Sequence, residues 1–311
     1  MLEGVPLADL RHAAELLSRR YRAEMRDGNL HLADGLAVKA YLATRLPATY
    51  AAIRAAMAAL SATLPAFEPK SLLDVGAGPG SALWAAVDCW PEFEHAALVE
   101  ASAAVRQAGA ELMSEAPLPP TQWIAADVAS AFPELSAADL VTIAYVLDEL
   151  PPAAIASLVE RLWNLTAGVL LIVEPGTPAG WGRVVDVRRQ LVDLGARLVA
   201  PCPHEASCPL KVPDWCHFSR RVARSRLHRL AKSGDVPWED EKFIYLAASR
   251  APVAAPGSRV LAPPRSASGR VTLKLCHTDG TAGELAMSKR EGAVYKQARR
   301  LDWGDTFLPD R

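Results

Sequence analysis

A glycine-rich loop between an apolar run and a helical run constrains the fold of this chain more than any other feature. Residues 71–75 read SLLDV, residues 76–80 read GAGPG, and residues 81–88 read SALWAAVD. Glycines in such a loop let the backbone turn sharply and approach a ligand closely. The order strand, glycine loop, helix therefore predicts a ligand-binding turn at the carboxyl end of a strand in an α/β sheet.

The same alternation of short apolar runs and helical stretches continues to about residue 200, and KFIYLAAS at 242–249 adds a last strand. Alternation of this kind predicts an α/β fold with a mostly parallel sheet covered on both faces. Residues 1–65 are rich in Ala and Leu with helical spacing, and predict a helical N-terminal unit. We expect a sheet domain over 66–250 with a Cys- and Arg-rich insertion at 201–241, and a linker with a C-terminal extension over 251–311.

Within the C-terminal extension, Pro, Ala and Ser dominate residues 251–269 and predict a linker or mobile loop. The runs RVTLKLC and GELAMSKR that follow predict a short β-hairpin, and REGAVYKQARR predicts a basic helix.

The composition is that of a globular protein, with 50% hydrophobic and 22% charged residues among 311. No apolar run reaches the roughly 18 residues of a membrane-spanning helix, so we expect no membrane partner. The N-terminal residues read as an amphipathic helix without the features of a secretory signal. We therefore expect a cytoplasmic protein.

Charge is distributed unevenly along the chain. Residues 1–181 carry 11 Lys and Arg against 21 Asp and Glu, and residues 182–311 carry 23 against 14, so the halves have net charges of -10 and +9. A basic half is expected for a protein with a polyanionic partner. A solvated basic face, or a surface that docks on the acidic half, would give the same distribution.

The glycine spacing is G-x-G-x-G, which resembles the first motif of class I methyltransferases more than the G-x-G-x-x-G of dinucleotide-binding folds. Glu100 ends the next strand, where an acid accepts hydrogen bonds from ribose hydroxyls. Asp127 follows the third strand and is a candidate for contact with adenine, although it could equally cap a helix. The candidate residues for binding S-adenosylmethionine are Asp74, Gly76, Ala77, Gly78, Gly80, Glu100 and Asp127.

Two acidic residues, Asp148 and Glu149, follow the fourth strand at the edge where the methyl acceptor is expected. Either could act as a general base, and an acidic helix cap explains them equally well. The Asn/Asp-Pro-Pro-aromatic motif of enzymes that methylate base amino groups is not present here, which disfavours that reaction.

Three cysteines, Cys202, Cys208 and Cys216, lie in the segment PCPHEASCPLKVPDWCH. Close cysteines in a cytosolic chain favour a metal site over disulfides. Zinc and iron-sulfur clusters both accept four cysteines, and the spacing favours iron-sulfur only slightly. The candidate for the fourth ligand is Cys276, and the alternatives are His204, His217 and His277.

A basic run, SRRVARSRLHRLAK, follows the cysteines. A helix here would place Arg220, Arg224 and His228 on one face, where they could contact phosphates. A solvated helix is the alternative. The candidate RNA-binding residues are Arg220, Arg221, Arg224, Arg226 and Arg229.

Several of these stretches together resemble one family, the methyltransferase-like proteins associated with assembly of the mitochondrial small ribosomal subunit, and their bacterial relatives. The stretches are AYLATRLPATYAAIRAAM, LLDVGAGPG, PCPHEASCP, DWCHFSRRVARSRLHRLAKSG, EDEKFIYLAASR and SKREGAVYKQARRLDWGD. The resemblance covers about residues 38–305. The cysteine-to-arginine stretch is its most specific part.

The resemblance implies a class I methyltransferase fold that binds S-adenosylmethionine, and a [4Fe-4S] cluster on Cys202, Cys208, Cys216 and Cys276. It also implies association with small-subunit ribosomal RNA during ribosome assembly, and through this a role in translation. Methyl transfer itself is a weaker implication, so a non-catalytic, cluster-dependent assembly factor is the first alternative. A small-molecule methyltransferase with a structural zinc is the second.

Overall fold

A helical unit opens the chain in the computed structural model, which describes residues 2, 4–23, 31–128, 132–254 and 257–308. Its helices are α1 (Leu7–Arg22), α2 (Gly35–Thr44) and α3 (Leu46–Thr63). Pro47 lies in the first turn of α3, where its missing N–H costs nothing. The Asp34 carboxylate caps α2 by accepting from Leu36 N and Ala37 N. The N-terminal segment predicted as an amphipathic helix covers residues 1–25, of which 1, 3, 24 and 25 lie outside the described residues.

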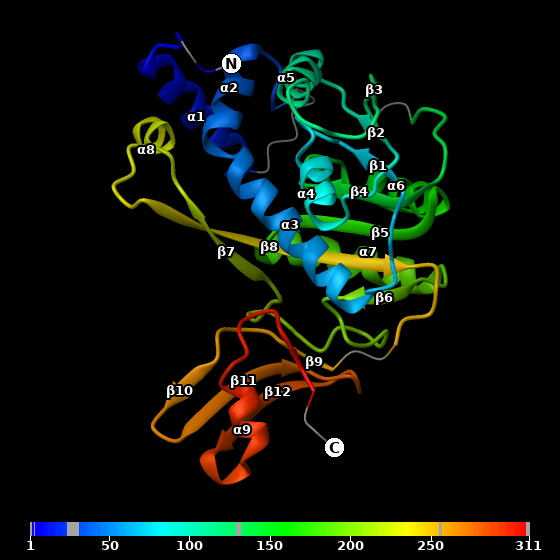
Figure 1. Ribbon diagram of the computed structural model, residues 1–311, viewed down its shortest axis with the longest axis vertical. Helices are drawn as coiled ribbons and strands as arrows, with labels where there is room; N and C mark the ends of the chain where they lie inside the picture. Colours follow the sequence, from blue (N-terminus) through cyan, green and yellow to red (C-terminus); the bar gives the residue numbers. More distant parts are fainter. Residues whose placement is uncertain (1, 3, 24–30, 129–131, 255–256, 309–311) are drawn as a thin grey trace.

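A central sheet of eight strands forms the largest part of the molecule (Figure 1). The strand order is β3-β2-β1-β4-β5-β8-β6, with β7 paired to β8. Strands β1 to β5 are parallel, while β8 runs antiparallel to β5, β6 and β7. The predicted α/β class with a mostly parallel sheet is confirmed. The strands are β1 (Ser71–Val75), β2 (His95–Val99), β3 (Thr121–Ile124), β4 (Ala138–Ala144), β5 (Thr166–Pro175), β6 (Arg197–Ala200), β7 (Phe218–Ala223) and β8 (Trp238–Ser249).

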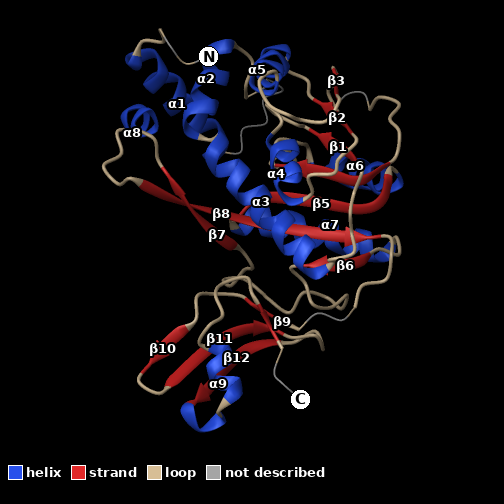
Figure 2. Ribbon diagram, in the orientation of Figure 1, coloured by secondary structure: helices blue, strands red, loops and turns tan. Residues whose placement is uncertain are grey.

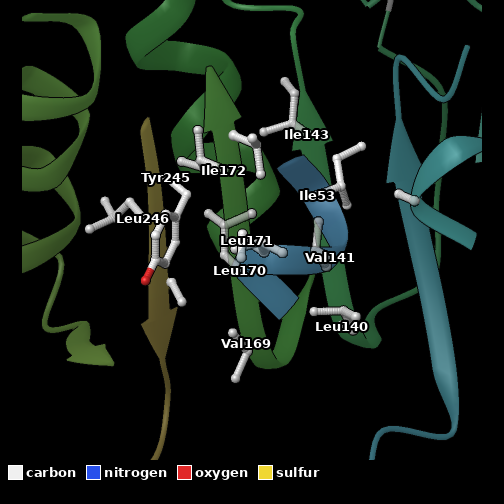
Figure 3. Packing of buried hydrophobic residues seen from close by; sticks show 14 of the residues in the cluster. Ile53, Leu140, Val141, Ile143, Val169, Leu170, Leu171, Ile172, Tyr245 and Leu246 are labelled. Atoms are coloured by element: carbon white, nitrogen blue, oxygen red, sulfur yellow. The ribbon is translucent and has the colours of Figure 1, made fainter. Parts of the chain in front are cut away.

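Helices cover both faces of this sheet (Figure 2). They include α3 and the connecting helices α4 (Ser81–Cys89), α5 (Ala103–Met113), α6 (Pro152–Asn164) and α7 (Pro178–Asp193). Figure 3 shows side chains of β4, β5 and β8 from the main core, with Ile53 of α3 among them. Central strands such as β5 are buried almost throughout because helices pack on both of their faces. None of the helices within the described ranges has the length and apolar content that crossing a bilayer requires.

A second, smaller sheet follows at the C-terminus, below the main sheet in Figure 1. Its strand order is β10-β11-β9-β13, with β12 paired to β11, and Leu273, Leu275 and Tyr295 lie in its separate core. The predicted β-hairpin is confirmed, since β11 and β12 pair antiparallel. The elements are β9 (Ser258–Val260), β10 (Arg265–Ala267), β11 (Arg270–Cys276), β12 (Ala282–Ser288), the 3-10 helix η1 (Lys289–Glu291), α9 (Ala293–Ala298) and β13 (Thr306–Phe307).

The segment predicted as a linker, 251–269, contains β9 and β10 and is therefore not a simple linker. Both strands pair with β11, so backbone hydrogen bonding outweighs the loop-like composition. Residues 255 and 256 of this segment lie outside the described residues.

The single helix predicted over the basic run is also wrong. Residues 218–223 form β7, and only Arg226–Lys232 are helical, as α8. In the β7–β8 pair, Arg220 lies opposite Glu241 and Arg221 opposite Asp240, and facing opposite charges stabilise a strand pair. At its tip, α8 packs on α1, and the Arg11 Nε donates to Leu230 O at 2.7 Å.

Candidate functional site

A cavity of about 350 Å³ lies at the carboxyl ends of β1 to β4. This is the edge where open α/β sheets bind ligands, and the volume is in the range of small-molecule sites. Of the residues predicted to bind S-adenosylmethionine, four line the cavity: Gly76, Gly78, Glu100 and Asp127.

The glycine loop has the backbone that its sequence predicts. Gly76 has a φ of +69°, and a Cβ added there would collide with the side chain of Val146 after β4. Gly78 has a φ of +55° and open space where a Cβ would stand. The loop thus lies tightly against β4 on one side and leaves its backbone uncovered toward the cavity at Gly78.

Glu100 connects this loop to the start of α5. Its carboxylate accepts from Gly78 N at 3.0 Å and from Ser102 N at 2.8 Å, through different oxygens. Burial raises the pKa of Glu100, and the two backbone hydrogen bonds act in the opposite direction. Because a carboxylate oxygen can accept more than one hydrogen bond, both oxygens keep capacity for a ligand.

Asp74, Ala77 and Gly80 support the loop without lining the cavity. Asp74 is 2% exposed and accepts a hydrogen bond from Thr142 Oγ1 of β4 at 2.7 Å. Burial raises the pKa of Asp74 to about 7. Ala77 N donates to Val99 O, and Gly80 is the N-cap residue of α4.

The two acidic candidates after β4 lie in different places. Glu149 lines the cavity, with its carboxylate 3.4 Å from Nδ1 of His31. Burial first, and then the charges of Asp148 and Glu100, raise the pKa of Glu149 to about 8. Asp148 is buried and does not belong to the cavity lining; it also contributes to raising the pKa of Glu174.

The cavity residues that the sequence did not reveal include Tyr41, Arg45 and Tyr145. Tyr145 directly follows β4 with a φ of +58°, and its hydroxyl donates to Glu241 Oε1 of β8 at 3.1 Å. Tyr145 could have been proposed from the sequence, because it directly follows the fourth strand, at the edge where the ligand is expected to bind. Tyr41 and Arg45 come from the helical N-terminal unit, and no local pattern places them at the sheet edge.

The four predicted cysteine ligands line one second cavity, between α7, β8 and the end of β11. All are free thiols. Burial raises the pKa of Cys216, and Cys202, Cys208 and Cys276 act in the same direction, as close neighbours do. Within the described ranges, no three His, Cys, Asp or Glu side chains converge closely enough to hold a single metal ion.

Of the three rival histidines, only His204 lines this second cavity, with Nε2 3.4 Å from the Cys276 sulfur. His217 stacks on Trp215. The Nδ1 of His277 lies 3.1 Å from the Ser258 hydroxyl.

The five arginines of the basic run fall into two groups. Arg221 binds Asp240 through two hydrogen bonds of 2.8 and 2.9 Å, and Arg224 lies 3.2 Å from Glu239. In the part of the chain that the structure describes, no carboxylate pairs with the remaining three, which are exposed: Arg220, Arg226 and Arg229.

Solved methyltransferases resemble the fold only broadly. An O-methyltransferase family protein from Burkholderia thailandensis aligns with a TM-score of 0.49 and 12% identity, covering 79% of this chain and 71% of that protein. The magnesium protoporphyrin IX methyltransferase of Synechocystis PCC 6803 with bound SAH aligns at 0.43 and 14%, covering 78% and 100%.

Curated relatives are similar over most of this chain. The human mitochondrial ribosome assembly protein METTL17 is 30% identical over 298 residues, which are 90% of this chain and 64% of that protein. The Rsm22-cox11 tandem protein 2 of Schizosaccharomyces pombe, also mitochondrial, is 22% identical over 323 residues, covering 87% and 43%. The chain thus spans between two fifths and two thirds of the length of these relatives.

The cytoplasmic location predicted above is contradicted, because these relatives are named as mitochondrial. The prediction used the lack of a secretory signal, which does not separate the cytoplasm from mitochondria, since mitochondrial targeting segments are amphipathic and rich in Arg. A family model described as mitochondrial small ribosomal subunit Rsm22 matches residues 35–308. With most of its length matched, from the helical unit to the C-terminal sheet, the chain belongs to the Rsm22 family.

Proposed function

We propose that the cavity at the carboxyl ends of β1 to β4 binds S-adenosylmethionine. The observation that carries this proposal is the Glu100 carboxylate, which faces the cavity while two backbone N–H groups hold it in place. Glu100 would accept hydrogen bonds from the ribose hydroxyls, and Asp127 would lie toward the adenine. The backbone at Gly76 and Gly78 would contact the methionine part of the ligand.

In this proposal the methyl acceptor enters beside Tyr145 and Glu149, which follow β4 next to the glycine loop. Methyl transfer from a sulfonium needs in-line positioning and exclusion of water, and it needs a base only where the acceptor carries a proton. Burial raises the pKa of Glu149 to about 8, so the ionised form that can accept such a proton becomes more populated as the pH rises toward 8. Asp148 is too enclosed for this role.

We further propose that the four cysteines hold a [4Fe-4S] cluster. The donor set fits such a cluster, since four thiols from two distant segments surround one cavity. When bound, the cluster would cross-link the segment of Cys202, Cys208 and Cys216 to Cys276, and it would be able to accept or donate an electron. Iron, sulfide and zinc analysis after anaerobic purification tests this proposal: about four iron and four sulfide per chain support it, and stoichiometric zinc without sulfide would contradict it.

The cellular role proposed for the chain is assembly of the small ribosomal subunit, with ribosomal RNA as the partner. The family description and the name of the human relative support this role. The net charge of +9 over residues 182–311 favours binding to the phosphates of RNA.

A pair of glycine variants tests the cofactor site. Gly78→Arg introduces a large side chain at the cavity, and its Cβ would have no protein atom within 4 Å. This variant is expected to abolish S-adenosylmethionine binding, as measured by calorimetry. Gly195→Arg is the matched control, because Gly195 also has a positive φ and open surroundings but lies after α7, away from the cavity. Equal affinity in both variants would contradict the proposed site.

An assay for transfer of tritiated methyl groups from S-adenosylmethionine to immature small-subunit RNA distinguishes a methyltransferase from a non-catalytic assembly factor. If no methyl enters the RNA, and ribosome assembly is unaffected by Gly78→Arg, the chain acts without catalysis. A colourless, zinc-containing protein without RNA affinity would instead indicate a small-molecule methyltransferase.

A further inference from the structure

Two arginines from different units of the fold are buried beside the cavity lined by the four cysteines. Arg188 belongs to α7 and Arg259 to β9, and each is 4% exposed. Neither guanidinium forms an ion pair with a carboxylate among the described residues. A buried cation without an opposite charge is strongly destabilising, so each of these side chains requires an anion.

The hydrogen-bonding partners of these arginines among the described residues carry no negative charge. Arg188 Nη2 donates to His204 O at 2.7 Å and to Ala206 O at 2.6 Å, and lies 3.5 Å from Nδ1 of the His204 ring. Arg259 donates from Nε to Pro201 O at 3.0 Å and from Nη1 to Gly304 O at 2.7 Å. The bonds to Pro201, His204 and Ala206 hold the cysteine-bearing loop in place, and none of the four bonds to backbone carbonyls neutralises either charge.

Each guanidinium also keeps a buried donor that finds no acceptor within the described residues: Nε of Arg188 and Nη2 of Arg259. Arg188 lines the cavity together with the cysteines. Arg259 lies opposite Cys276 in the antiparallel β9–β11 pair. Both guanidinium groups therefore lie close to the sulfur ligands of the proposed cluster.

We infer that Arg188 and Arg259 neutralise the charge of the cysteine-bound cluster and donate N–H hydrogen bonds toward its sulfurs. This inference rests on the proposed [4Fe-4S] cluster. Four thiolates around a doubly positive iron-sulfur core leave two negative charges, and the two guanidinium ions supply two positive ones. The oxidised site is then electrically neutral in a buried position, which accounts for arginines that lack carboxylate partners.

The arrangement has a redox consequence, because reduction adds one electron to the cluster. Nearby positive charge and N–H donors to sulfur favour the reduced form and so raise the reduction potential. Removing either guanidinium charge is therefore expected to make the potential more negative. A purely structural role would not give this shift.

Redox titration of the full-length, anaerobically reconstituted protein, followed by absorbance and electron paramagnetic resonance, tests the inference. Arg188→Gln and Arg259→Gln are each expected to shift the midpoint potential to more negative values than wild type. Arg188→Lys and Arg259→Lys keep the charge and are expected to recover most of the shift. Arg197→Gln is the matched control. Arg197 of β6 is exposed and forms an ion pair of 3.0 Å with Glu205 of the cysteine-bearing loop.

The outcomes separate this inference from the proposed cluster itself. If wild-type protein contains no iron and sulfide, the cluster proposal fails. If wild type holds the cluster and both Gln variants keep the wild-type potential, only the role of the arginines fails. If the Gln variants do not incorporate iron, the Lys variants distinguish the two explanations. Iron incorporation in the Lys variants supports a role for the positive charge, and its absence there contradicts that role.

Discussion

At the scale of single residues, burial has changed the acid-base properties of several carboxyl groups near the cofactor cavity. Asp74 under the glycine loop has its pKa raised to about 7, and Glu149 at the cavity wall to about 8, in both cases mainly by burial. These groups favour their neutral form in the folded protein. Each therefore couples folding to pH.

Asp74→Asn tests this coupling. A carboxyl whose pKa is raised on folding stabilises the protein below its unfolded pKa, near 4, and this contribution is lost as the pH rises through about 7. The unfolding free energy of Asp74→Asn relative to wild type should therefore rise between pH 4 and 7, on the order of 1 kcal/mol per pH unit. Urea unfolding across this range measures the difference.

The control for this measurement is Asp186→Asn, because Asp186 is exposed on α7. It is expected to give a difference from wild type that does not change with pH. Contributions from Glu149 and Glu174 are present in every protein of the set and cancel. A pH-independent difference for Asp74→Asn would mean that Asp74 is ionised in the folded state at pH 4 to 7.

At the scale of elements, the β7–β8 pair with α8 at its tip divides the arginines of the basic run into two groups. One group forms ion pairs with β8, and the other does not. Arg221 and Arg224 are held by acidic residues of β8, Asp240 and Glu239. In the described chain, the exposed arginines without a carboxylate partner are Arg220, Arg226 and Arg229. Only this second group is free to contact phosphates.

Neutralising Arg220, Arg226 and Arg229 to Gln is expected to weaken RNA binding and to lower its salt dependence. For each phosphate that is no longer bound, the slope of log affinity against log salt should fall by about 0.7 to 0.9. Filter binding at several salt concentrations measures both quantities. Arg221→Gln is the control and should leave the slope unchanged. An equal decrease of the slope in this control would show that the ion pair of Arg221 does not exclude it from RNA binding.

The basic run also shows where reasoning from the sequence alone is wrong at this scale. Helical spacing predicted one helix with Arg220 and Arg224 on a shared face, yet β7 places Arg220 in a strand and ends before Arg224. The deciding partners, Glu239 to Glu241, follow by some twenty residues, and short-range periodicity does not contain them. By contrast, the strand, glycine loop and helix at 71–89 were predicted correctly because every signal for them is local.

At the scale of the whole molecule, the cysteine cavity lies where the central sheet and the C-terminal sheet meet. Three cysteines follow β6, and Cys276 ends β11 of the second sheet. Arg259 of β9 makes a further connection by donating to Pro201 O. A group bound by all four thiols would therefore tie the two sheets together.

Cys276→Ser is expected to lower both the iron content and the melting temperature, because metal binding and folding are linked when ligands come from two units. Iron analysis and thermal unfolding by circular dichroism measure the two effects. Cys89→Ser on α4 is the control, since Cys89 lies outside the cavity, and it should retain full iron. Full iron in Cys276→Ser would instead point to His204, which lies beside Cys276, as the fourth ligand.

The sequence by itself determined the parallel sheet, the glycine loop, Glu100 at the next strand end and the cysteines as a set, because strand and helix periodicity and short motifs are local in the chain. Only the tertiary structure decided that Glu149 rather than Asp148 faces the cavity, that Tyr41 and Arg45 complete its wall, and that Arg188 lines the cysteine cavity while Arg259 lies opposite Cys276 in the β9–β11 pair. These placements depend on contacts between segments far apart in sequence, where burial and charge are properties of the packed molecule and not of any local pattern.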